Sequence, residues 1–141
     1  MSCMYCDNTH EKRAELLIEV GKLPHSTLFI LKNQNHLGRV VVALDGHRTE
    51  VYEMTPEERE GFFADVAAVS KAMSELFHPD KINYGIFGDG VPHVHMHIVP
   101  KYKDQLQWGH FFWDKGEVEV TLSDAEYQKM VEDYKRLLNI K

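Results

Sequence analysis

The sequence predicts an α+β fold in which helices pack on an antiparallel sheet. Residues 26–31 and 39–44 are apolar runs joined by a polar turn, which predicts a β-hairpin. A second pair of strands is predicted at residues 82–87 and 93–99, because only the short glycine-containing turn 88–92 separates them. Helical patterns elsewhere complete an α+β arrangement of about five strands, with a long helix packed on the sheet and a C-terminal helix.

The long helix has a clear start signal. Thr55 can cap it, Pro56 suits the first helical position, and Glu58 completes a capping box. The apolar spacing then extends the helix to about Phe77. Seven apolar side chains are expected on its buried side: Phe62, Phe63, Val66, Val69, Ala72, Met73 and Leu76.

The remaining predicted elements are shorter. Residues 9–20 carry apolar side chains at helical spacing and are closed by Gly21, which predicts a short helix. Ser123 and Glu126 form a second capping box and predict the C-terminal helix. Residues 117–121 predict a further short strand.

The composition fits one globular domain spanning residues 1–141. Of these residues 43% are hydrophobic and 27% charged, and the formal net charge is −6. No run of lysine and arginine is long enough to follow a nucleic-acid backbone, so we expect no nucleic-acid partner. The first ten residues hold no apolar run, and the longest apolar stretch, residues 40–44, is too short to span a bilayer. We therefore expect a cytoplasmic protein without a membrane partner.

Three histidines alternate along the last predicted strand, at His93, His95 and His97. Successive side chains of a strand point to opposite faces, so the three imidazoles should share one face, while the apolar residues between them face the core. His93 and His97 should lie roughly 13 Å apart along the strand. Zinc binds imidazole nitrogen at about 2.0–2.1 Å, so the outer two cannot easily share one ion. The row therefore predicts three separate roles.

The pattern His-φ-His-φ-His-φ-φ, where φ is apolar, resembles the motif that names the histidine triad (HIT) family of nucleotide hydrolases and transferases. The Cys3-Met4-Tyr5-Cys6 start, the Pro100-Lys101-Tyr102 segment and the Trp108-Gly109 segment are also similar to bacterial members. The resemblance implies a small antiparallel sheet with a helix packed on it. It also implies a homodimer, a nucleotide substrate with a purine base, and no organic cofactor.

The resemblance further implies a hydrolase of the nucleoside phosphoramidase or dinucleoside polyphosphate hydrolase type. His95 would attack the α-phosphate and carry the nucleotidyl group, and His97 would touch phosphate oxygens or the leaving group. Water would then release nucleoside monophosphate. Imidazole suits such an attack, because its ordinary pKa of about 6.5 leaves it mostly neutral. Its other nitrogen must donate a proton to a fixed acceptor, and a backbone carbonyl of the same strand could serve.

Five further residues are candidates for binding the substrate. Gly88 and Gly90 could let backbone N–H groups approach a phosphate, although an ordinary hairpin turn explains them equally well. Asp89, between them, departs from the family pattern, so it either points away or binds something other than phosphate. Asn83 could donate a hydrogen bond or merely satisfy the sheet edge. Arg39 could clamp a phosphate or be a solvated strand residue.

Cys3 and Cys6 have the spacing of half a structural zinc site. In bacterial HIT relatives with this pair, the partners resemble His47 and His93, which implies a structural zinc held by these four residues. His10 is a rival ligand. A redox pair, or two cysteines that pack loosely at a chain end, would explain the cysteines without a metal.

Two other functions are compatible with the same residues. The protein could be a metal-dependent hydrolase in which histidines of the triad hold a catalytic ion. It could also be a nucleotide-binding module with negligible catalysis.

Overall fold

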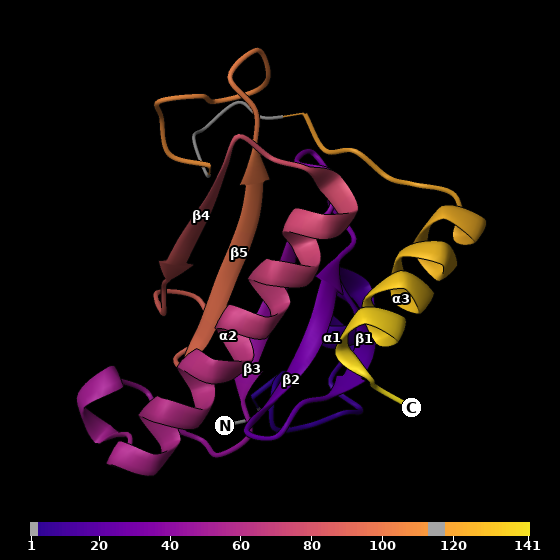
Figure 1. Cartoon of the computed structure of the whole chain (residues 1–141). Helices are drawn as coiled ribbons and strands as arrows, with labels where there is room; N and C mark the ends of the chain where they lie inside the picture. Colours follow the sequence, from indigo (N-terminus) through magenta and orange to yellow (C-terminus); the bar gives the residue numbers. More distant parts are fainter. Residues whose placement is uncertain (1–2, 113–117) are drawn as a thin grey trace.

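The computed structural model describes residues 3–112 and 118–141 of the chain. The elements follow one another in this order (Figure 1): α1 (Glu11–Leu16), β1 (Leu17–Lys22), β2 (Ser26–Leu31), β3 (Val40–Leu44), the 3₁₀ helix η1 (Val51–Glu53), α2 (Pro56–Phe77), β4 (Lys81–Ile86), β5 (His95–Lys101) and α3 (Asp124–Leu138).

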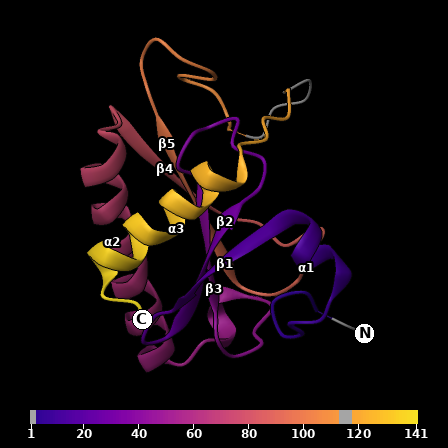
Figure 2. The same ribbon diagram turned by 90° about the vertical axis from the view of Figure 1, so that its right-hand side faces the viewer.

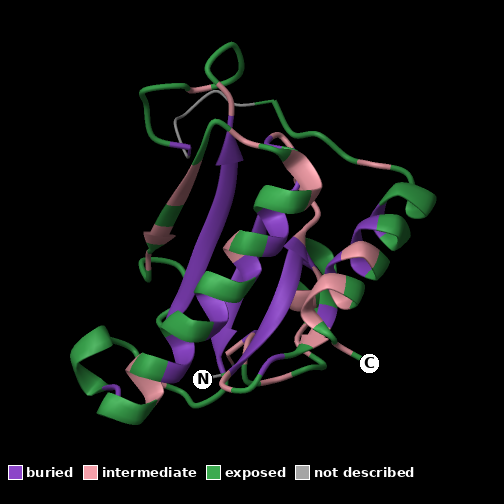
Figure 3. Ribbon diagram, viewed as in Figure 1, coloured by how far each residue is buried: buried purple, intermediate pink, exposed green. Residues whose placement is uncertain are grey.

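The five strands form one antiparallel sheet in the order β1-β2-β3-β5-β4. The predicted α+β fold is therefore confirmed, and so are both predicted strand pairs. Helices α2 and α3 lie on one side of the sheet and α1 lies on the other (Figure 2). Strands β3 and β5 are buried along their length, and α2 buries only the stripe that faces the sheet (Figure 3). His95 and His97 thus lie on a strand that is buried along its whole length.

The start of α2 follows the sequence prediction. Thr55 accepts a hydrogen bond from the backbone N–H of Glu58, and the Glu58 side chain completes the capping box. The helix ends where His78 adopts a left-handed conformation. Phe63, predicted to be buried, is instead 52% exposed. Phe62 already faces the core, and one residue further along a helix the side chain is rotated by about 100°.

The predicted helix at residues 9–20 is wrong beyond Leu16. Residues 17–22 form strand β1, which pairs with β2 and would otherwise leave β2 as an edge of the sheet. Backbone pairing with that edge outweighs the local helical spacing. Gly21, which indicated a helix end, has φ of 152°, and a Cβ there would lie 2.5 Å from Cγ2 of Ile140. The glycine is therefore needed for the close approach of the C-terminal segment.

The predicted strand at residues 117–121 is not formed over its described part, residues 118–121, while Glu117 lies outside the described residues. Val120 still accepts a hydrogen bond from the backbone of Gln34 at 2.8 Å and donates one to the Asn33 side chain. These two hydrogen bonds attach Val120 to the loop after β2 without adding a strand to the sheet. The predicted number of strands is right, but the fifth strand is β1.

None of the helices in the described part of the chain combines the length and the apolar character that a membrane crossing requires.

Candidate functional site

The triad lies on and just before β5, the strand next to the β4 edge of the sheet. His95 and His97 are in β5, between β3 and β4, and His93 lies two residues before the strand begins. In the register of the sheet, His97 is opposite Val41 on one side and Gly85 on the other. The residues between the histidines, Val94, Met96 and Ile98, belong to the core under α2 and α3, as the alternation predicts. The three imidazoles therefore point away from these helices.

His95 has a defined tautomer. Its Nδ1 lies 2.5 Å from the carbonyl oxygen of His93. A carbonyl only accepts hydrogen bonds, so Nδ1 must carry the proton and Nε2 keeps its lone pair. Burial lowers the pKa of this imidazole, opposed by the same hydrogen bond, and the ring is therefore neutral near pH 7. These are the properties that a nucleophilic histidine needs.

His97 is also neutral. Burial, followed by the nearby His95 and the Arg39 guanidinium, lowers its pKa to about 3. Its ring centroid is 5.2 Å from that of His95 and 6.0 Å from that of Phe87. A neutral imidazole can donate one hydrogen bond to a ligand and accept another, but it adds no positive charge to the cavity.

The two histidines line a cavity of about 620 Å³. Four of the predicted substrate-binding residues line it as well: Arg39, Gly88, Asp89 and Gly90. Its remaining walls are mostly apolar and aromatic: Met4, Tyr5, Leu16, Leu17, Leu31, Asn33, Val41, Phe87, Val91 and Phe111. Asn83 is not among these residues and lines a second cavity instead. The structure thus brings four of the five candidates to the triad and separates the fifth.

Arg39 is buried, so its interpretation as a solvated strand residue is wrong. Its Nη1 donates to Oδ1 of Asn35 at 2.7 Å, and its guanidinium lies over the Phe112 ring at 5.8 Å from the centroid. Held in this way, the group presents a fixed positive charge at the cavity. Asp89 lies in the exposed turn at the cavity rim. A Cβ added to Gly90 would meet nothing within 4 Å, so the fold itself does not require that glycine.

A second cluster joins the N-terminal segment to the triad strand. Ligand atoms of Cys3, Cys6, His47 and His93 all lie within 4.8 Å of one another, and this group could hold a metal ion. The closest pairs are Nδ1 of His47 with Nδ1 of His93 at 3.1 Å, and Sγ of Cys6 with Nδ1 of His47 at 3.3 Å. Tetrahedral zinc with sulfur and nitrogen ligands separates such atoms by roughly 3.3–3.8 Å. The donor set and its spacing therefore fit zinc.

The other ring nitrogen of His93 supports the same arrangement. Its Nε2 lies 2.7 Å from the carbonyl oxygen of Leu44, so Nε2 carries the proton and Nδ1 has a lone pair to offer a metal. His10 is not part of the cluster. Its Nδ1 accepts a hydrogen bond from the backbone of Lys12 and caps α1. The rival ligand is therefore occupied elsewhere.

Tyr5 is a site residue that the sequence did not reveal. It lies between the two cysteines, and its ring contacts His95, His93 and Phe29, with centroids 4.8, 5.5 and 5.7 Å away. A lone tyrosine near a chain end has no periodicity or motif that could indicate such a contact. Only the fold of the N-terminal segment onto the sheet brings it there.

The fold and the paired imidazoles on β5 define a class of protein, and the comparison with known families agrees. Residues 16–104 match the family model described as the HIT domain. The chain belongs to the histidine triad (HIT) family.

Two curated relatives match part of the chain. The protein hit of Bacillus subtilis is 31% identical over 83 residues, which are 55% of this chain and 57% of that protein. The asymmetrical bis(5′-nucleosyl)-tetraphosphatase of Schizosaccharomyces pombe is 32% identical over 71 residues, which are 47% of this chain and 39% of that protein. The matched region thus spans about half, or less, of each relative.

Solved structures resemble the chain over nearly its whole length. A histidine triad protein from Bradyrhizobium japonicum has a TM-score of 0.83 at 22% identity, covering 92% of this chain and 96% of that one. A histidine triad protein from Marinobacter aquaeolei has the same TM-score at 23% identity, covering 93% and 95%. At these identities the likeness is one of fold.

Proposed function

We propose that the protein hydrolyses nucleotide conjugates at the α-phosphate, with Nε2 of His95 as the nucleophile. One observation carries the proposal: the His93 carbonyl fixes the proton on Nδ1 of His95, and the same imidazole lines a cavity large enough for a nucleotide. The homologous tetraphosphatase of fission yeast supports a substrate of this class.

The reaction has two steps. The lone pair of Nε2 forms a bond to the α-phosphorus while the bond from phosphorus to the leaving group breaks, which gives a nucleotidyl-histidine. Water then attacks the same phosphorus, the P–N bond breaks, and nucleoside monophosphate is released. In this proposal the neutral His97 hydrogen-bonds to phosphate oxygens or the leaving group. The Arg39 guanidinium offsets negative charge as it develops on the phosphate.

Different walls of the cavity would bind different parts of the substrate. Apolar side chains of the N-terminal part of the chain, among them Leu16 and Leu31, suit the flat face of a purine. The turn that contains Gly88 and Gly90 would offer backbone N–H groups to the phosphate. Asp89 in that turn would face the ribose or solvent, where its negative charge is tolerated.

Trapping the intermediate tests this mechanism. Protein quenched in acid-free denaturant during turnover of a dinucleoside polyphosphate should carry one nucleotidyl group, and peptide mass spectrometry should place it on His95. His95→Ala should lose turnover by three orders of magnitude or more. His78→Asn, a change at an exposed histidine that caps α2, is the matched control and should retain activity. Normal turnover by His95→Ala would refute the mechanism, and tight nucleotide binding without turnover by the wild type would favour a binding module.

We further propose that a structural zinc is held by Cys3, Cys6, His47 and His93. The ion would cross-link the N-terminal segment to the residues just before β5. When bound, the ion would supply a rigid cross-link and no chemistry at the phosphate, because all four ligand positions are taken by protein. A chelator should therefore lower the unfolding temperature before it lowers activity in the folded fraction. Immediate loss of activity in fully folded protein would favour the metal-dependent hydrolase.

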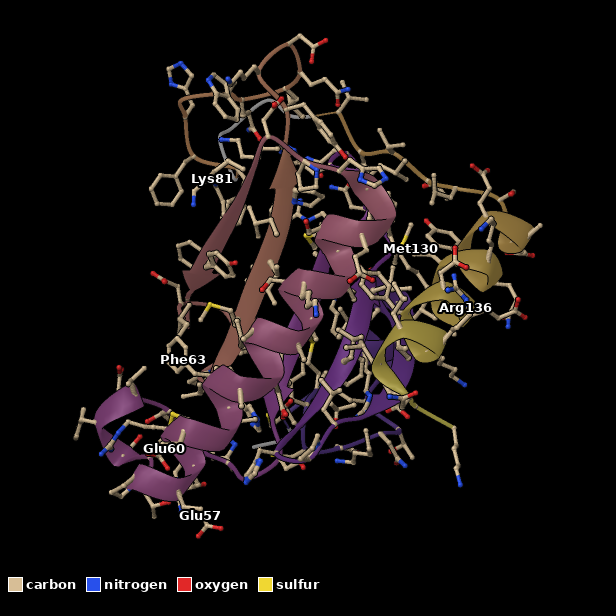
Figure 4. The ribbon with its side chains drawn as sticks, viewed as in Figure 1. Glu57, Glu60, Phe63, Lys81, Met130 and Arg136 are labelled. Atoms are coloured by element: carbon tan, nitrogen blue, oxygen red, sulfur yellow. The ribbon has the colours of Figure 1, made fainter. Side chains whose placement is uncertain are left out.

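The chain is proposed to act as a homodimer of single HIT domains. Strand β4 is an open edge of the sheet, and Tyr84 and Ile86 on it are 48% and 37% exposed. Phe63, also exposed, lies on the flank of α2 nearest β4 (Figure 4). A second copy could pair its own β4 with this edge and cover these side chains. Ile86→Lys should then reduce the mass measured by light scattering from dimer to monomer, and an unchanged dimer would place the interface elsewhere.

A further inference from the structure

One row of residues connects the β1 edge of the sheet to the triad. Glu19 in β1 is opposite Phe29 in β2. Phe29 is opposite Val41 in β3, which is in turn opposite His97 in β5. Residues directly opposite each other in paired strands share a face of the sheet. The side chains of Glu19 and Phe29 therefore lie on the triad face, which is the side of the sheet that carries α1 (Figure 2).

Arg13, from α1, contacts this row at two points. Its Nη2 donates to Oε1 of Glu19 at 2.5 Å, and its guanidinium carbon lies 4.8 Å from the centroid of the Phe29 ring. The arginine side chain is only 14% exposed. A guanidinium over an aromatic face is attracted more strongly where water is largely excluded. The row therefore gives the Arg13 side chain a defined position on the sheet.

The same guanidinium binds the segment that precedes α1. Its Nη1 contacts the carbonyl oxygen of Met4 at 3.3 Å and that of Tyr5 at 3.5 Å. A guanidinium carries five N–H donors in a planar fork, so one side chain can bind a carboxylate and two carbonyl groups together. The backbone at Tyr5 is therefore connected to the sheet through Arg13.

The ring of Tyr5 completes the connection to the proposed nucleophile. It contacts both Phe29 and His95, with ring centroids 5.7 and 4.8 Å away. The hydrogen bond from Nδ1 of His95 to the His93 carbonyl fixes the tautomer, but a single hydrogen bond lets the imidazole tilt about its own axis. An aromatic neighbour that packs against the imidazole limits that tilt. Arg13 thus fixes Tyr5, and Tyr5 fixes the plane of His95.

We propose that Arg13 is a positioning residue of the active site, which holds the Tyr5 ring against His95 and so keeps Nε2 aimed at the phosphorus. This inference rests on the proposed function, because the aim of Nε2 matters only if His95 is the nucleophile. Arg13 itself is not one of the residues that line the triad cavity. It should therefore act on the rate of the chemical step and not on the binding of substrate.

A double-mutant cycle on kcat tests whether Arg13 acts through Tyr5. Arg13→Gln should lower kcat about fivefold and change KM by less than about twofold. In a Tyr5→Leu background the same substitution should lower kcat by less than about twofold, because the ring that Arg13 positions is already gone. Equal losses of kcat in the two backgrounds, or an unchanged kcat in Arg13→Gln alone, would overturn the proposal.

Two further variants separate positioning from folding. Arg13→Met keeps a flexible side chain over Phe29 but removes the donors, so it should show the same loss of kcat and the same dependence on Tyr5. If Arg13→Gln does not fold, Arg13→Met takes its place in the cycle. Arg136→Gln, at an exposed arginine of α3 that pairs with Asp133, is the matched control and should keep the wild-type kcat. The kinetics are run well below the unfolding temperature of every variant.

Chemical labelling of His95 tests its placement without turnover. Diethyl pyrocarbonate acylates a neutral imidazole that it can reach, and peptide mass spectrometry measures the extent at each histidine. His95 should be labelled about threefold or more faster in Arg13→Gln than in the wild type, because the Tyr5 ring no longer covers it. The exposed His78 should be labelled equally in both proteins.

An unchanged rate of labelling at His95 would overturn the proposal. If the wild type hydrolyses no nucleotide, the proposed function fails, whereas the labelling still decides whether Arg13 holds Tyr5 against His95. The two failures are therefore distinguishable.

Discussion

The ring of Tyr5 packs against the imidazole of His95, with 4.8 Å between the centroids and 35° between the ring planes. Tyr5 is held there from two sides. The guanidinium of Arg13 lies 3.3 and 3.5 Å from the carbonyl oxygens of Met4 and Tyr5, and the flanking cysteines belong to the proposed metal cluster. The proposed nucleophile is therefore supported by a segment that the metal site would fix in place.

Replacing Tyr5 should slow the reaction without emptying the metal site. In Tyr5→Leu the His95 ring loses its aromatic neighbour and samples other orientations, so kcat should fall about tenfold while KM changes little. Tyr5→Phe keeps the ring and should recover most of the rate. Steady-state kinetics, with zinc content and unfolding temperature measured on the same samples, separates this positioning role from a structural one. A loss of rate that Phe does not recover would contradict the role of the ring.

Removing one cysteine should release the N-terminal segment. Cys6→Ser should lower the zinc content well below one ion per chain and reduce the free energy of unfolding by about 3 kcal/mol, since binding free energy of a structural metal is folding free energy. Added zinc should raise the unfolding temperature of the wild type and not that of the variant. His10→Ala, which removes the rival ligand, should leave the zinc content unchanged. Equal zinc in Cys6→Ser and wild type would exclude this cluster as the metal site.

The sheet core and the triad face could be predicted because their signals are local. The capping box at Thr55 and the alternation around His95 each need only a few neighbouring residues to operate. Strand β1 could not be predicted, because its formation depends on the open edge of β2. The cavity that Asn83 lines could not be predicted for a related reason. The residue lies on the correct face of the sheet, but the position of the loop after β5 decides which cavity it lines.

Acid should destabilise the protein partly through His97. Its pKa is about 3 in the folded chain, because of burial, His95 and Arg39, against about 6.5 when unfolded. Between these values the unfolded chain binds a proton that the folded chain does not. The free energy of unfolding therefore falls as pH falls, by up to about 1.4 kcal/mol per unit from this group. His97→Gln cannot take up that proton, so its urea-unfolding stability should decline less steeply between pH 6.5 and 4. Parallel slopes for the two proteins would show that His97 does not contribute.

Replacing Gly21 should cost stability, because both its backbone conformation and its surroundings oppose a side chain. At φ of 152° an L side chain is strained, and the new methyl would lie 2.5 Å from Cγ2 of Ile140. Gly21→Ala should therefore lower the free energy of unfolding by about 2 kcal/mol, measured by urea denaturation. Gly90→Ala is the matched control, since its methyl meets no atom within 4 Å and its φ is not positive, and it should change stability by less than about 0.5 kcal/mol. Combining Gly21→Ala with Ile140→Ala removes the collision but not the backbone strain. Gly21→Ala should thus cost less stability in the Ile140→Ala background than in the wild type. An equal cost in both backgrounds would assign the whole loss to backbone conformation.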